Sequence, residues 1–249
     1  MRFVWLLTAF FVAAPALPQA PANESAKKAR ELLDQVVTAL GGAAFRSLKT
    51  ARLEGRLYAF RRGDLSGLAQ VVEYVRYPDK QREEYGQNKE EIQIVNGDKG
   101  WTVDINGVKP LSTEEMKEYR EAESQRAFYI LRYRLGEEGS TVEYAGRELW
   151  ENREVDLVRF FDAENRAVTI SLDRSTHLPL RAVRVRRDPK TRERIEETEI
   201  FSNYFTSNGV TAPRHLMRLR NGNRIFEAFI REVRYNMELP ESLFTPPQR

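Results

Sequence analysis

The sequence contains no cysteine and only two histidines, His177 and His215, among its 249 residues. The absence of cysteine excludes disulfide bonds, thiol catalysis and cysteine-based metal sites. It also excludes the lipidated cysteine that a bacterial lipoprotein carries after its signal. The two histidines lack the close spacing of metal-binding pairs. We therefore expect neither a metal nor a cofactor.

Motifs of catalysis and nucleotide binding are also missing. The chain has no Gly-x-Ser-x-Gly, no His-Glu-x-x-His, no P-loop and no dinucleotide glycine fingerprint. Acidic residues are spread among basic ones, as in 192–197, and the formal net charge is only +3. This interleaving is typical of solvated surfaces and gives no reason to expect nucleic acid as a partner. The absences favour a protein that is not an enzyme, with an enzyme of unknown type as the alternative.

The N-terminus has the layout of a secretory signal. Arg2 forms a short positive region, and the apolar run from Phe3 to Ala14 is shorter than the roughly 20 residues of a membrane-spanning helix. Small residues flank Pro15 and Pro21 and fit a cleavage site, so we assign residues 1–22 to a signal peptide. An uncleaved N-terminal anchor is the alternative. We expect the exported chain, which has no lipidated cysteine, to be free in a periplasm.

The remaining residues, 23–249, have a length that suits one domain. Apolar residues at spacings of three and four predict an amphipathic helix directly after the signal. The apolar stripe consists of Ala29, Leu32, Leu33, Val36, Val37 and Leu40. The pair Gly41 and Gly42 ends this helix.

From Thr50 the apolar spacing changes to two, which predicts half-buried strands. Five strands up to Ile105 are separated by short turns, which favours an antiparallel meander. A capping box at Ser112 and Glu115 then predicts a helical segment that extends to Leu135. Further strands are expected at about 141–149, 153–162, 166–173, 178–187, 193–205, 212–220 and 223–235.

The last part of the chain carries the most informative motifs. A strand ends in the aromatic Tyr204, Asn208 and Gly209 supply the positive-φ positions of a hairpin turn, and Pro213 follows near a strand start. The final strand runs into Asn236 before a closing Phe and Pro. In this order the segment resembles the closing strands of the LolA/LolB-like lipoprotein-carrier superfamily. Further segments similar to that family are 77–82, 95–101 and 173–179.

The resemblance implies a mainly β fold with some helix. Members fold as an incomplete antiparallel β-barrel, here of about a dozen strands, with a helical lid over an apolar cavity. Within that plan the alternation predicts a cavity wall made of Leu53, Leu57, Ile92, Ile94, Trp101 and Val103, and a lid made of Leu33, Val36, Val37 and Leu40. Ordinary core packing is the alternative for both sets, because a sheet around a cavity and a sheet around a full core share the same period.

The function that the resemblance implies is carriage of a hydrophobic ligand. We expect an exported carrier or chaperone that holds a lipid or the acyl chains of a lipoprotein for trafficking in the cell envelope. A transient inner- or outer-membrane protein is the implied partner. The alternative is an envelope-stress sensor that binds such material and acts on a membrane partner.

Overall fold

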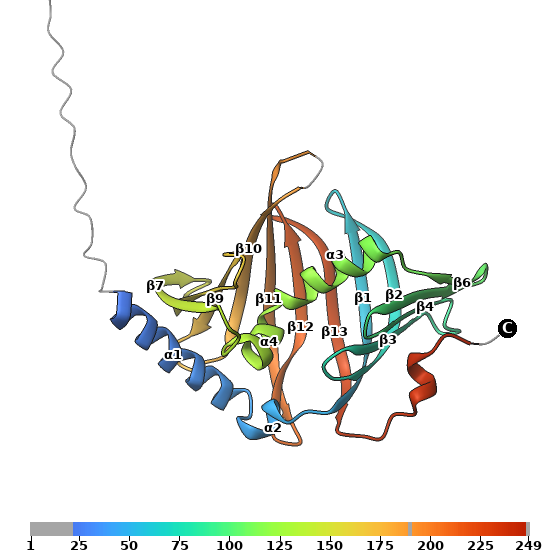
Figure 1. Ribbon diagram of the computed structural model, residues 1–249, viewed down its shortest axis with the longest axis horizontal. Helices are drawn as coiled ribbons and strands as arrows, with labels where there is room; N and C mark the ends of the chain where they lie inside the picture. Colours follow the sequence, from blue (N-terminus) through green and yellow to red (C-terminus); the bar gives the residue numbers. More distant parts are fainter. Residues whose placement is uncertain (1–21, 189–190, 248–249) are drawn as a thin grey trace, which may run out of the picture.

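The computed structural model describes residues 22–188 and 191–247, and over these residues thirteen antiparallel strands form one sheet (Figure 1). The strand order is β6-β5-β4-β3-β2-β1-β13-β12-β11-β10-β9-β8-β7. Residues 1–21, which hold all but the last residue of the predicted signal peptide, lie outside this description. The assignment of 23–249 to one domain stays a prediction.

The sheet consists of two meanders. In each, consecutive strands are joined by loops of two to about six residues and therefore pair as antiparallel hairpins. The first contains β1 (Thr50–Arg61), β2 (Asp64–Arg76), β3 (Lys80–Tyr85), β4 (Glu91–Asn96), β5 (Lys99–Asp104) and β6 (Gly107–Pro110). The second contains β7 (Thr141–Trp150), β8 (Arg153–Phe161), β9 (Ala167–Asp173), β10 (Pro179–Arg187), β11 (Arg194–Ser207), β12 (Val210–Arg220) and β13 (Asn223–Tyr235).

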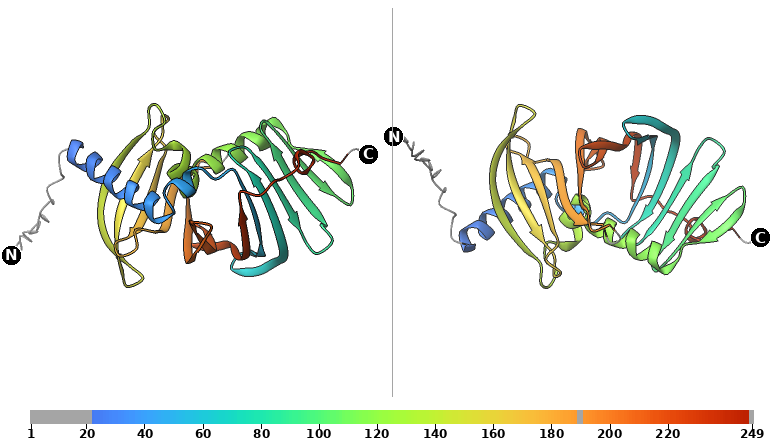
Figure 2. Two further views of the ribbon diagram at one scale, coloured as in Figure 1. Left: turned by 90° about the horizontal axis from the view of Figure 1, so that it is seen from below. Right: turned by 90° about the horizontal axis from the view of Figure 1, so that it is seen from above.

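Pairing of β1 with β13 joins the two meanders into one curved sheet. The sheet does not close, because the end strands β6 and β7 lie at opposite ends of the molecule (Figure 2). This confirms the predicted incomplete antiparallel barrel. The predicted turn between β11 and β12 is also confirmed, since Asn208 and Gly209 adopt φ values of 47° and 76°.

Helices cover one face of the sheet. They are α1 (Ala22–Ala39), α2 (Ala43–Arg46), α3 (Thr113–Ser124), α4 (Ala127–Tyr129) and the π-helix η1 (Ile130–Arg134). The capping box at Ser112 and Glu115 begins α3, as predicted. The helical segment is not continuous, however, because Arg126 is extended, with φ −76° and ψ 140°. The chain therefore turns between α3 and α4, and the π-helix shifts the side-chain spacing of the residues that follow.

The apolar core lies under α1. The stripe of α1 and the side chains of Ala127, Ile130 and Leu131 pack against inward-facing residues of β7 to β11, among them Val158, Phe160, Ile170 and Phe201. These side chains are almost completely buried. The space between α1 and this half of the sheet is thus filled by closely packed side chains. This packing holds the helix in place.

The C-terminal segment crosses the other face of the first meander. Its short 3₁₀ helix η2 (Glu241–Phe244) lies against β3 and β4. Arg82 donates to the Leu243 carbonyl at 3.2 Å, and Asn96 donates to the Phe244 carbonyl at 3.1 Å. The Phe244 side chain is fully buried. The strands β3 and β4 are therefore covered on both faces, by α3 on one side and by η2 on the other.

Candidate functional site: a groove beneath α3 and the π-helix

The four predicted lid residues are core residues of α1. Leu33, Val36, Val37 and Leu40 are 3, 0, 3 and 0% exposed. The helix packs chiefly against β7 and β8, at the opposite end of the sheet from β4 and β5, which supply four of the six predicted wall residues (Figure 1). The stripe therefore lies far along the sheet from those strands. Whether it acts as a lid stays a prediction.

The predicted wall is divided between the two faces of the sheet. Leu53 pairs with Glu73 of β2, and Glu73 pairs with Glu83 of β3. These residues share the face of Gln81, whose side chain accepts a hydrogen bond from Tyr119 of α3. Leu57, four residues after Leu53 on β1, lies on the same face. Leu53 and Leu57 are therefore on the helix-covered side.

Ile92, Ile94, Trp101 and Val103 lie together on the opposite side. Ile94 pairs with Trp101, and Ile92 pairs with Val103. Gln81 pairs with Val95, so Val95 points toward α3 and its neighbour Ile94 points away from it. Ile94 and Val95 are 0 and 8% exposed, so both faces are buried at this point, although Glu91 and Gln93 on the face of Val95 are exposed. The alternation therefore marks the isoleucine face as apolar but does not show that α3 lies on the other side. Whether these four residues bind a ligand stays a prediction.

An unfilled space lies under α3 and η1 on the helix-covered side. A pocket of about 400 Å³ is bounded by β2, β3 and β4 below and by α3, α4 and η1 above. Its apolar and aromatic lining consists of Phe45, Leu48, Val75, Tyr77, Val95, Tyr119, Phe128, Tyr129 and Tyr133. The volume is within the range of about 300–1,000 Å³ that is usual for small-molecule sites.

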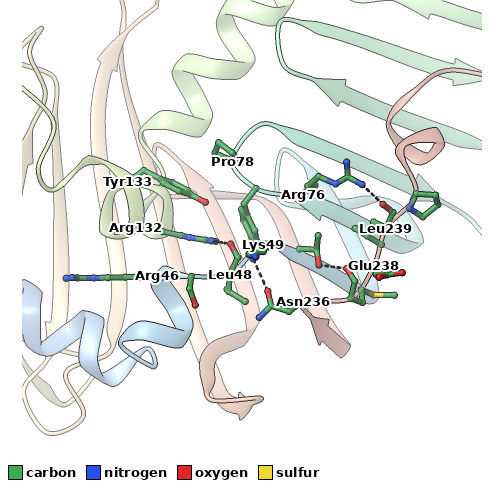
Figure 3. A pocket seen from close by; sticks show the side chains of 15 residues that line it. Arg46, Leu48, Lys49, Arg76, Pro78, Arg132, Tyr133, Asn236, Glu238 and Leu239 are labelled. Carbon is green, nitrogen blue, oxygen red and sulfur yellow. Dashed lines mark hydrogen bonds between the residues drawn. The ribbon is translucent and has the colours of Figure 1, made fainter.

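A second, wider pocket of about 1,020 Å³ opens beside the first (Figure 3). It lies between the start of β1, the end of β2, η1 and the segment 236–240. The two pockets share Leu48, Tyr77, Pro78, Arg132 and Tyr133 as lining residues. Because the two pockets adjoin at these residues, we treat them together as one groove, with the wider pocket as its outer end and the narrower pocket as its inner end. This groove is our candidate site.

Arg132 stands where the two pockets meet. Its guanidinium lies 4.0 Å from the ring centroid of Tyr77 and 4.9 Å from that of Tyr133. It donates one hydrogen bond from Nη2 to the Leu48 carbonyl, and its buried Nε has no acceptor among the described residues. Burial also raises the pKa of the Tyr77 phenol, with the Glu73 carboxyl as a further cause. The phenol therefore stays neutral beside the cation.

The inner end of the groove contains polar groups beneath α3. Glu73 lines it, and the neighbouring Gln81 donates a hydrogen bond of 2.6 Å to the Glu73 carboxyl. Burial, and then the nearby carboxylates of Glu83 and Glu123, raise the pKa of Glu73 to about 8. The Glu73 carboxyl is consequently protonated at neutral pH and adds little charge to the groove.

One constellation on the opposite face has the residue types of a catalytic triad. Ser202 Oγ lies 2.8 Å from His215 Nδ1, and His215 Nε2 lies 2.7 Å from Glu227 Oε1. The three residues lie on β11, β12 and β13. The backbone N–H groups of these strands donate the hydrogen bonds between neighbouring strands of the sheet. A nucleophilic serine also needs donors for an oxyanion. The arrangement is that of a cross-strand polar network, which sequence spacing alone does not reveal.

Residues 22–188 and 191–247 contain neither a cluster of metal ligands nor a membrane-spanning helix. Within these residues no group of three or more acidic or histidine side chains is arranged to hold a metal ion. No helix of the same residues is both long and apolar enough to cross a membrane.

Comparison by sequence finds no protein-family model and no curated protein that matches the chain. Comparison by structure does find similar proteins. A domain from Vibrio parahaemolyticus described as an outer membrane lipoprotein-sorting protein superposes with a TM-score of 0.59 at 12% identity, covering 90% of this chain and 97% of that domain. A DUF1329 family protein from Desulfovibrio piger gives 0.60 at 12% identity, over 87% and 97% of the two chains.

A third structure names the superfamily. The LolA superfamily protein NE2245 from Nitrosomonas europaea has a TM-score of 0.55 at 11% identity, over 89% of this chain and 97% of its own. None of the three descriptions is of an enzyme. At such low identity the likeness concerns the fold. The chain therefore has a LolA-like fold.

Proposed function

We propose that this protein binds a lipid, or the acyl chains of a lipoprotein, in the groove beneath α3 and η1 and carries it without chemical change. The groove supports this proposal because apolar and aromatic side chains make up about half of its inner lining, in a LolA-like fold. Burial of a chain would supply roughly 0.8 kcal/mol for each methylene removed from water. Leu53 and Leu57 lie on the helix-covered side but do not line the pocket, and we infer that they contact the part of a longer chain that extends beyond it.

The proposed setting is the periplasm, after removal of a signal peptide within residues 1–22. A lipoprotein-sorting relative and the apolar N-terminal run support it. An acyl chain must be shielded between two membranes, and a groove of this kind would shield it. A transient membrane-protein partner would then load or receive the ligand.

Uptake of a fluorescent fatty acid tests the proposal. Val75 faces the groove, whereas Val72 lies on the opposite face of the same strand, because adjacent positions alternate. We expect the native protein to bind the probe and release it when palmitate is added. Val75→Trp should fill the groove and weaken binding at least tenfold, while Val72→Trp should leave binding within about twofold.

Two results would overturn the proposal. One is a folded native protein that takes up no probe. The other is equal weakening by both tryptophan variants, which would place the probe elsewhere. Mass spectrometry of the recovered ligand completes the test, since a chemically altered ligand would indicate an enzyme.

A further inference from the structure

We propose that the wide outer end of the groove recognises the anionic head group of an amphipathic ligand, with Arg132 as the anchoring residue and Lys49 and Arg46 as additional cations. This inference rests on the proposed function and names its ligand class: a carboxylate or phosphate carried on an alkyl chain. The residues that support it come from three elements, η1, the start of β1 and α2 (Figure 3).

Arg132 has unused capacity for an anion. Among the described residues no carboxylate lies within ion-pair distance of it, and its one hydrogen bond goes to the Leu48 carbonyl. Arg134, two residues later, is by contrast held by Glu137 at 2.6 Å and by Asp162 at 3.7 Å. The Arg132 guanidinium lies over the ring of Tyr77, and this contact holds it in position. A fixed planar fork is suited to two oxygens of a carboxylate or phosphate.

The charge around the outer end is mostly positive. Its lining contains Arg46, Lys49, Arg76 and Arg132 but only one acidic residue, Glu238. Arg76 is already engaged by Glu241 and by the Leu239 carbonyl. The pair between Arg46 and Asp34 spans 3.7 Å, with side chains 58 and 77% exposed, so water screens it strongly. Lys49 is exposed and has no ion-pair partner among the described residues.

The two ends of the groove differ in charge. Beyond Arg132 the apolar residues Phe45, Val75, Val95 and Phe128 alternate with polar ones, and the acidic residues there outnumber the cations: Glu73, Asp79, Asp98 and Glu123 against Lys80 and Arg120. Two of the acidic residues at the inner end are in ion pairs: Glu123 with Arg126 at 2.7 Å, and Asp98 with Arg120. An alkyl chain would therefore lie under α3, with its charged end beside Arg132 at the wide opening.

An anionic oxygen group could belong to a lipid or to free phosphate, and three probes distinguish these sources. Dodecyl phosphate carries both the chain and the charge, dodecanol carries the chain alone, and inorganic phosphate carries the charge alone. Binding of each is measured by calorimetry on the native protein and on Arg132→Gln, Arg132→Lys and Lys49→Gln. Arg30→Gln, an exposed cation on α1, is the matched control.

The inference predicts that the native protein prefers dodecyl phosphate over dodecanol. Arg132→Gln should weaken dodecyl phosphate binding about tenfold and change dodecanol binding less than twofold. Arg132→Lys should recover only part of the loss, because an ammonium lacks the planar fork. Lys49→Gln should weaken dodecyl phosphate binding by a smaller factor. Because Lys49 is exposed, this variant should fold even if Arg132→Gln does not, and the test then rests on it. Arg30→Gln should change nothing.

The outcomes separate this inference from the proposed function. If neither dodecyl compound binds, the proposed function fails. If both bind equally and neither Arg132→Gln nor Lys49→Gln alters the ratio, the groove binds lipid but the head-group inference is wrong. If inorganic phosphate binds as tightly as dodecyl phosphate, the site accepts free phosphate and the lipid assignment is overturned.

Discussion

The phenol of Tyr119 on α3 donates a hydrogen bond to the side-chain carbonyl of Gln81 on β3. This bond spans the inner end of the groove and fastens the helix to the strand beneath it. A second attachment lies nearby, where Arg120 donates to the Gly97 carbonyl at 3.0 Å. Helix α3 is thus held partly by individual polar contacts, which can be broken at modest cost, whereas α1 adds a buried apolar stripe to its polar contacts with Tyr144.

Removal of the Tyr119 hydroxyl should loosen α3. We expect Tyr119→Phe to lower the free energy of unfolding by about 1 kcal/mol, the usual contribution of one hydrogen bond. Hydrogen exchange of the amides in 113–124 should become faster. Tyr58→Phe is the control, since the described residues offer the Tyr58 hydroxyl no hydrogen-bond partner and it lies on the other face. Unchanged exchange in Tyr119→Phe would show that Gln81 does not hold the helix.

Substitution within the α1 stripe should affect folding rather than binding. Leu33 is 3% exposed in a closely packed core, so Leu33→Ala should cost about 2–5 kcal/mol of unfolding free energy. Uptake of the fluorescent fatty acid should be unchanged at temperatures where the variant is folded. Denaturant unfolding measures the first effect and fluorescence titration the second. A large loss of binding at unchanged stability would instead support the lid that the sequence predicts.

The fold was predictable because its signals are local. The two-residue alternation from Thr50, the capping box at Ser112 and the turn at Asn208 each specify one element, and the order of the closing motifs suggests the superfamily. The arrangement of the site was not predictable in this way. In β4 both Ile94 and Val95 are buried, so the sequence pattern does not show that Val95, rather than Ile94, points toward α3.

The groove itself also depends on long-range placement. Arg132 meets Tyr77 only because a π-helix and a strand end come together across 55 positions of chain. Among so many arginines, neither composition nor spacing distinguishes this one. Carrier and sensor are likewise not separable by sequence, because both roles use the same apolar scaffold.

The stability of the protein should fall with rising pH through ionisation of Glu73. Its pKa is raised from the ordinary 4.5 to about 8. The folded state therefore holds this proton more tightly than the unfolded state. The resulting stabilisation is fully present below about pH 4.5 and is lost as the pH rises through about 8. The groups that face Glu73 are Gln81 and Glu83 of β3, together with Glu123 and Arg126.

Glu73→Gln tests this dependence because glutamine cannot ionise. Relative to native protein, we expect the variant to gain about 2 kcal/mol of unfolding free energy between pH 5 and pH 9, allowing for partial access of solvent. Urea unfolding at the two pH values provides the measurement. Glu118→Gln, an exposed site on α3, is the control. Parallel pH profiles for native protein and Glu73→Gln would contradict the prediction.

The two faces of the first meander can be distinguished by contact quenching. Trp101 shares a face with Ile94, opposite to the groove, so a brominated fatty acid bound under α3 should leave Trp101 fluorescence unchanged. Tyr129 lines the groove, and Tyr129→Trp combined with Trp101→Phe places the reporter there. The brominated ligand should quench this reporter strongly, and the non-brominated ligand should not. Trp150 on β7 is present in both proteins and serves as a common background. Strong quenching of Trp101 without quenching of the introduced tryptophan would locate the ligand beside Ile92, Ile94 and Val103, and the groove would then lose its proposed role.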